Sequence, residues 1–202
     1  MTGVGITLPN KTHVDFDPSV SLGRNRTHLP VLFDTGATHN YLTNDLYFAI
    51  GALYPDAKWY RDREGQPAFK VPCDAPLGTL DYTFGETTIK VPFQESLDRD
   101  DVSGFCNFGF RLGPQDEGKI PYILGDTFMR GAYMVFDLDN DEFWMGEKAD
   151  CGSNIVAVGK GKDAVPVVPG CGSGIGDKPK PTKTGYKPPP APTALERGDF
   201  VY

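Results

Sequence analysis

Short stretches of alternating apolar and polar residues, separated by turns, constrain the fold of this chain more than any other feature. The clearest one runs from Leu80 to Val91 and alternates on both sides of Gly85-Glu86, which is the pattern of a β-hairpin. The chain also contains 24 Gly and 18 Pro among 202 residues, a content that favours turn-rich β architecture over a helical bundle. We therefore predict a mainly β fold, with further extended pieces at 105–111, 120–124, 131–137 and 142–147.

The first quarter of the chain predicts three more strands and one helix. Apolar residues alternate over 4–8, a short apolar run covers 29–33, and 40–42 is a third extended piece. A helix is expected over 44–53, because apolar residues recur there at i, i+4 and i+7 and Thr43 can cap its first turn. One helix among many strands keeps the prediction mainly β.

The composition changes near residue 159 and divides the chain into two parts. Residues 159–202 hold 8 Pro and 8 Gly and have no long apolar periodicity. Such a segment cannot bury enough apolar surface to offset the entropy lost on ordering. We predict a folded domain over 1–158 and a disordered Pro/Gly/Lys-rich tail over 159–202, with a solvated extension favoured over a partner-binding segment.

Charge and hydropathy exclude several classes of function. The formal net charge is −7 and the isoelectric point is about 4.9, which argues against a nucleic-acid-binding surface. No run of 18 or more apolar residues is present, so no transmembrane segment is predicted. The four cysteines form no C-x-x-C pair and only three histidines accompany them, so we expect no metal site.

The cysteines and two tripeptides point to the secretory pathway. An even number of cysteines suits two disulfides, and Cys151 and Cys171 at the junction with the tail are one candidate pair. Asn10-Lys-Thr and Asn25-Arg-Thr both match the N-glycosylation pattern. The N-terminus shows no signal peptide, which conflicts with secretion unless an N-terminal region has been lost.

The residues best suited to chemistry are Asp34, Thr35 and Gly36, directly after the apolar run 29–33. This position would expose the Asp34 carboxylate at a tight turn, where the Thr35 hydroxyl can support the loop and Gly36 lets another backbone segment approach closely. In isolation these three residues more often form an ordinary turn than a catalytic loop. Other segments of the chain are therefore needed to distinguish the two interpretations.

Three longer segments in a fixed order resemble the C-terminal lobe of pepsin-like aspartic proteases. They are Phe33-Asp-Thr-Gly-Ala-Thr38, Pro121-Tyr-Ile-Leu-Gly-Asp-Thr-Phe128 and Ala132-Tyr-Met-Val-Phe-Asp-Leu-Asp139, and the resemblance covers about residues 3–150. It implies one lobe of the double-ψ acid protease fold, in which the loop at Asp34 crosses a later segment, here Ile123, Leu124 and Gly125.

The resemblance also implies roles for individual residues. Asp34 matches the catalytic aspartate of the second lobe, and Thr35, Gly36 and Thr38 match its supporting loop. Tyr41 is a candidate substrate-pocket residue, although core packing is favoured for it, and packing is also expected for Trp59 and Trp144. Cys73 and Cys106 fall where this lobe has its disulfide. The family acts on polypeptides without a metal or cofactor in secretory or vacuolar compartments.

One aspartate is not sufficient for this chemistry, which needs two carboxylates that share a proton. The chain contains no second D-T-G or D-S-G. A missing N-terminal lobe or a second copy of the chain would have to supply the partner carboxylate. We therefore expect an aspartic endopeptidase represented by its second lobe, as a fragment, a truncated gene model or a processed chain. The alternatives are a non-catalytic binding module with the same fold and, less favoured, a homodimer of the retroviral protease type.

The residue after the D-T-G triplet departs from the usual pepsin-like pattern. The family commonly has a hydroxyl residue there that donates a hydrogen bond to the carboxylate, and this chain has Ala37. Without that hydrogen bond the ionised carboxylate is less stabilised. We therefore expect a less acidic pH optimum than for an Ala37→Thr variant.

Overall fold

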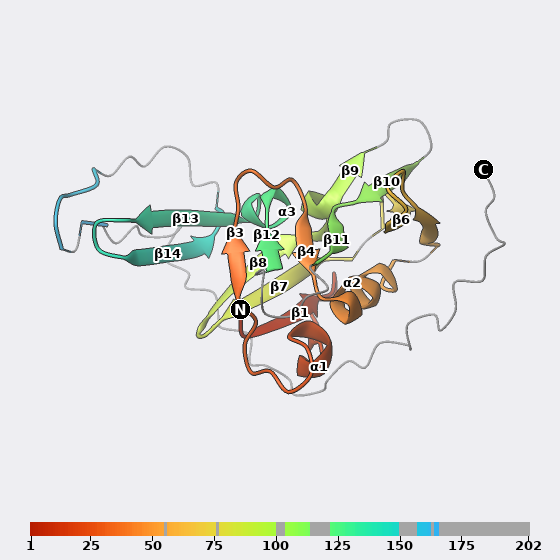
Figure 1. Cartoon of the computed structure of the whole chain (residues 1–202), viewed down its shortest axis with the longest axis horizontal. Helices are drawn as coiled ribbons and strands as arrows, with labels where there is room; N and C mark the ends of the chain where they lie inside the picture. The colour runs from red at the N-terminus through yellow and green to blue at the C-terminus, as the bar shows by residue number, and fades with distance from the viewer. Residues whose placement is uncertain are drawn as a thin grey trace.

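The computed structural model describes residues 1–54, 56–75, 77–99, 104–113, 122–149, 157–162 and 164–165. Three four-stranded sheets, one two-stranded sheet and a few short helices make up this part of the chain, as Figure 1 shows. The mainly β architecture predicted from the sequence is confirmed. Cys151, Cys171 and nearly all of the predicted tail lie outside the described residues.

The first sheet is antiparallel throughout and carries much of the core on one face. Its strand order is β2 (His13–Asp15), β1 (Gly3–Thr7), β7 (Thr79–Phe84) and β8 (Thr87–Pro92). The predicted hairpin is β7–β8, and its turn contains Gly85 in the left-handed region at φ 61°. The buried face of the sheet is formed by Val4, Ile6, Leu80, Tyr82, Ile89 and Val91.

The second sheet has the order β11 (Phe110–Leu112), β4 (Asn40–Leu42), β12 (Tyr122–Leu124) and β3 (Val31–Phe33). Strand β12 pairs in parallel with β3 and in antiparallel orientation with β4. A strand from late in the chain therefore lies between two strands from its first quarter, as seen near the centre of Figure 1. This arrangement positions the candidate site.

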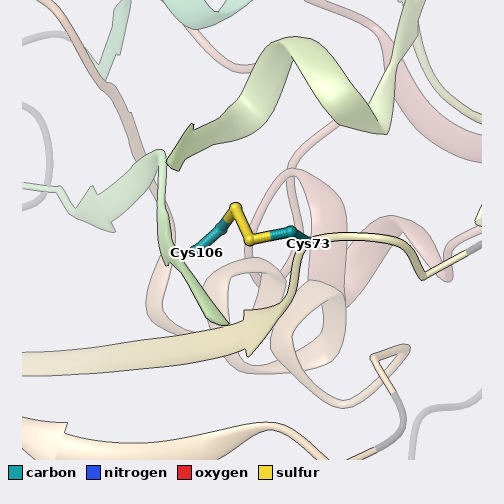
Figure 2. Close-up of a disulfide and its surroundings, with 2 residues drawn as sticks. All are labelled: Cys73 and Cys106. Carbon is teal, nitrogen blue, oxygen red and sulfur yellow. A yellow bond between two sulfur atoms is a disulfide. The ribbon is translucent and has the colours of Figure 1, made fainter. Parts of the chain in front are cut away.

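The third sheet has the order β5 (Lys58–Arg61), β6 (Pro67–Pro72), β10 (Phe105–Phe108) and β9 (Leu97–Arg99). The disulfide implied for Cys73 and Cys106 is present and joins the end of β6 to β10 (Figure 2). Its Cα atoms are 5.1 Å apart and the two residues are 33 positions apart in sequence. It therefore fixes a sheet whose central strands come from distant parts of the chain.

The last two strands, β13 (Ala132–Asp137) and β14 (Glu142–Glu147), form a hairpin that extends away from the other sheets in Figure 1. Met134 and Met145 face each other and pack against the core. Trp144 is 46% exposed, so the packing role predicted for it is wrong, whereas Trp59 is packed against Phe48 and Phe69 as expected.

Short helices close the remaining sides of the sheets. The main one, α2 (Asn44–Gly51), is capped by Thr43, whose side chain accepts a hydrogen bond from the Leu46 amide as predicted. It ends two residues before the predicted boundary, at Gly51, where the ring of Phe69 leaves no room for a Cβ atom. The others are α1 (Pro18–Ser21), α3 (Asp126–Met129) and the 3₁₀ helix η1 (Phe93–Ser96).

Among the described residues, no helix has the length and apolar character needed to cross a membrane.

Candidate active site

The turn that follows β3 presents the Asp34 carboxylate. The Gly36 amide donates a hydrogen bond of 2.8 Å to Asp34 Oδ1, and the Ala37 amide donates one of 3.1 Å to the Asp34 carbonyl. Asp34 is half-buried, while Thr35 and Gly36 are exposed at the tip of the turn. A carboxylate held by its own turn and open to solvent on one side can take part in proton transfer.

Strand β12 secures this turn from the side. Leu124 lies beside Phe33 in the parallel pairing, and its carbonyl accepts a hydrogen bond of 3.1 Å from the Asp34 amide. Gly125 follows and passes under the loop so closely that a Cβ atom would lie 2.7 Å from the His39 carbonyl oxygen and nearer still to that of Ala37. The structure thus brings Ile123, Leu124 and Gly125 against the Asp34 loop, and only glycine fits at the crossing point.

A buried polar network holds the crossing together. Asn40 is fully buried in β4, and its Oδ1 accepts a hydrogen bond of 2.9 Å from the Gly125 amide. Its Nδ2 donates one of 2.9 Å to the hydroxyl of Tyr82, which is itself fully buried. Burial raises the pKa of the Tyr82 hydroxyl, so this group stays neutral. Asn40 therefore links the loop crossing to the first sheet.

The start of α3 adds a second set of contacts to the loop. The Asp126 amide donates a hydrogen bond of 2.8 Å to the Ala37 carbonyl, and the Thr127 amide donates one of 3.2 Å to the Thr38 carbonyl. The Thr127 hydroxyl lies 3.0 Å from the Thr38 carbonyl oxygen and 3.1 Å from that of Gly109. Thr38 is thus held through its main chain, while its side chain is exposed.

A row of side chains crosses the sheet on the side opposite the core. Leu32 of β3 is in register with Ile123 of β12, and Ile123 is in register with Tyr41 of β4. Tyr41 is in turn in register with Arg111 of β11. Leu32 is 48% exposed, and Ile123 and Tyr41 are half-buried. Tyr41 therefore lies on an accessible face of the sheet. This position is compatible with a role in a substrate pocket, the alternative to core packing that the sequence left open.

His39 lies on the same loop and is half-buried. Burial lowers its pKa, and the positive charges of Arg111 and Arg130 lower it further, while Asp98 acts in the opposite direction. The neutral imidazole is therefore favoured over the imidazolium at this position.

The family model for eukaryotic aspartyl protease matches residues 11–148. The chain belongs to this family. Its aspartyl protease relatives include a probable aspartic-type endopeptidase opsB of Aspergillus oryzae, 29% identical over 180 residues. Secreted aspartic protease 7 of Candida albicans is 36% identical over 118 residues, and Candidapepsin-1 of Candida albicans is 29% identical over 164 residues.

The chain spans well under half the length of these aspartyl proteases. The three matches cover 82%, 55% and 78% of this chain, but only 33%, 18% and 40% of the relatives. This proportion agrees with the interpretation of the chain as one lobe of the pepsin-like fold.

Sequence reasoning missed Asn40 and Tyr82, which support the site from inside the core. The available signal was an asparagine at the start of a predicted strand, directly before Tyr41 and Leu42, because a buried amide must find hydrogen-bond partners. Its partners, Gly125 and Tyr82, lie 85 and 42 residues away in sequence, so the pattern did not identify them.

Proposed function

We propose that this chain contributes Asp34 as one of two catalytic carboxylates of an aspartic endopeptidase. The observation that carries the proposal is the placement of Asp34 on a turn fixed by β12 between β3 and β4, with Gly125 directly beneath it. Thr35, Gly36 and Thr38 form the loop around the carboxylate. The substrate class is an extended polypeptide.

The chemistry requires a second carboxylate beside Asp34. The ionised carboxylate takes a proton from the attacking water, while the protonated one donates a hydrogen bond to the scissile carbonyl oxygen. Two close carboxylates share one proton because both cannot easily be ionised together, as is known for aspartic protease dyads. Peptide hydrolysis then proceeds through attack of the activated water on the carbonyl carbon.

A separate lobe is the proposed source of that second carboxylate. Apolar side chains near β3 support a covering partner, since Leu32 is 48% exposed, Phe136 is 51% exposed and Phe143 is 37% exposed. The Phe143 ring also stacks on that of Phe33, the residue before Asp34, with centroids 4.9 Å apart. A partner that covers this surface would meet the chain next to the site.

A chimera tests the proposal. This chain would replace the matched region of Candidapepsin-1, and cleavage of a fluorogenic peptide would be followed at about pH 3–6 with and without a pepstatin-type inhibitor. Asp34→Asn should lower kcat/KM by about 100- to 10,000-fold, because the carboxylate transfers the proton. Asp139→Asn, the same change at an exposed hairpin turn, is the matched control.

Two results would contradict this assignment. One is a folded chimera with no inhibitor-sensitive cleavage, which would favour the non-catalytic binding module. The other is full activity of Asp34→Asn. For the 202-residue chain alone, sedimentation analysis separates the homodimer from the single lobe, since only the homodimer needs a tight self-association.

We also infer that the chain is secreted and carries N-linked glycans at Asn10 and Asn25. Both side chains are exposed in turns, and the threonine two residues after each of them is also exposed. The disulfide and the names of the secreted relatives support the compartment. The chain would be secreted from yeast and treated with an endoglycosidase, which should lower its apparent mass in two steps, one for each glycan. The Asn10→Gln variant should show only one of these steps.

A further inference from the structure

One face of the β13–β14 hairpin carries exposed aromatic side chains. Side chains on paired strands alternate between two faces, and the register places Tyr133 beside Gly146 and Val135 beside Trp144 on the same face. The methionines that pack against the core lie on the opposite face. Tyr133 is 64% exposed and Trp144 is 46% exposed. We call the surface formed by Tyr133, Val135 and Trp144 the outer hairpin face.

The outer hairpin face has the properties of a binding surface. A Cβ atom added to Gly146, beside Tyr133, would meet no other atom within 4 Å, so the face is open at this point. Exposed tyrosine and tryptophan rings offer a large apolar area at an otherwise polar surface. Aromatic surfaces of this kind bind extended proline-containing segments, because such segments lose little conformational entropy on binding.

A turn from a later part of the chain lies at the tip of the same hairpin. Asn140, in the loop between β13 and β14, donates a hydrogen bond of 3.0 Å from its Nδ2 to the Gly161 carbonyl. The Gly159 amide donates one of 2.8 Å to the Ala164 carbonyl, which closes a turn around Gly161. In Figure 1 this segment is drawn in blue beside the tip of the hairpin. The chain is therefore anchored next to the outer hairpin face.

Opposite net charges favour the same contact. The end of the hairpin, residues 137–142, contains three aspartates and one glutamate. The turn at 159–164 contains two lysines, Lys160 and Lys162, and one aspartate, so its net charge is positive. Both lysines are exposed on either side of Gly161, whose carbonyl accepts from the hairpin. Attraction between the two segments therefore supports the hydrogen bond that anchors the turn.

The residues that follow the anchored turn are apolar. The sequence continues as Ala164-Val-Pro-Val-Val-Pro169, without a charged side chain. Ala164 and Val165 are half-buried, whereas residues 157–162 before them are exposed. The two prolines favour extended backbone for themselves and for the residues that precede them. An apolar segment suited to an aromatic surface thus begins at the tip of the hairpin.

The length of this segment matches the outer hairpin face. Asp137 and Glu142 form the last pair of the hairpin, and Trp144 lies two residues further along β14, at about 7 Å. Tyr133 lies four residues from Asp137 along β13, at about 13 Å. Residues 165–169 span about 15 Å in an extended polyproline-like form, which is sufficient to cover both rings.

We propose that the outer hairpin face binds residues 165–169 of the same chain, as an extended apolar segment across Trp144 and Tyr133. This segment is preferred to the later proline run at 188–192, because loop closure costs more as more residues separate a segment from the anchored turn. Phe143, which stacks on the residue before Asp34, lies on the opposite face, so the bound segment leaves the candidate site open. The inference does not depend on Asp34 or on catalysis.

Acrylamide quenching of Trp144 fluorescence in the full chain tests this docking. Trp59, the other tryptophan, would be replaced by phenylalanine so that Trp144 alone is observed. Burying one valine favours the docked form by about ten-fold or more. Val167→Asp together with Val168→Asp should therefore undock the segment and raise the quenching constant by about two-fold, since a charged side chain resists burial.

A second pair of substitutions is the matched control. Ala191→Asp together with Ala194→Asp adds the same two charges around the end of the later proline run and should leave the quenching constant unchanged. An unchanged constant for the valine pair would overturn the proposal. An equal rise for both pairs would do the same, because the effect would then follow from charge alone.

NMR of the unmodified chain tests the contact without replacing Trp59. Nuclear Overhauser effects should connect the indole ring of Trp144 to the methyl groups of Val165, Val167 or Val168, and their absence would contradict docking. In a mixture of isotope-labelled and unlabelled chains, no such effect should connect the two copies. Contacts between copies would show that the outer hairpin face binds a second chain, which would also overturn the proposal.

Discussion

Asn40 is the residue whose replacement should most clearly expose how the candidate site is supported. Asn40→Ala removes the acceptor of the Gly125 amide and the donor to the Tyr82 hydroxyl, both at 2.9 Å in the folded protein. Each buried polar group left without a partner costs about 1–3 kcal/mol, so the variant should lose about 2–6 kcal/mol of unfolding free energy. This is a large fraction of the stability of an ordinary domain.

Tyr82→Phe provides the second arm of a double-mutant cycle. It removes only the hydroxyl and leaves one Asn40 N–H without its partner, so it should cost about 1–3 kcal/mol. The double variant should cost less than the sum of the two, because both single changes break the same hydrogen bond. Urea denaturation at a fixed mildly acidic pH would measure all three free energies.

The cycle could refute the reasoning in two ways. A loss of less than about 1 kcal/mol for Asn40→Ala would mean that its two partners find other hydrogen bonds. Strict additivity would mean that Asn40 and Tyr82 do not act on one another. Asn107→Ala in β10, a half-buried asparagine outside this network, is the control for the general effect of the substitution.

Three further results are expected. Replacing Cys73 and Cys106 together by alanine should lower stability by about 4 kcal/mol, given the separation of 33 residues between them, and should lower the melting temperature by about 8–16 °C in calorimetry. Arg111→Gln removes a positive charge that lowers the pKa of His39, so an NMR titration should show that pKa rising. In an active chimera, Ala37→Thr should move the acidic limb of the pH–rate profile to lower pH, because a hydroxyl there can donate to the ionised Asp34; an unmoved limb would refute this.

Local patterns predicted the elements whose signals lie within a few residues of one another. The hairpin at 80–91 and the Thr43 cap are both present, because alternation, turn residues and a capping hydroxyl act locally. The short strands β2, β5, β6 and β9 were missed. Three of them are only three or four residues long, too short for alternation to stand out, and β6 takes one of its two partners, β10, from a distant part of the chain. Trp144 was assigned to the core because it is apolar, but its position on the outer face of β13–β14 leaves it exposed.

The family is recognisable from the residues around Asp34 and two later segments, and the sequence also shows a single D-T-G triplet. Which groups hold that triplet in place becomes visible only once the chain is folded. Asn40 of β4, Gly125 directly after β12 and Tyr82 of β7 are brought together, and His13 reaches Asp81 across a strand that lies between them. The physical reason is that hydrogen bonds between distant residues depend on strand order and register, which a linear pattern does not contain.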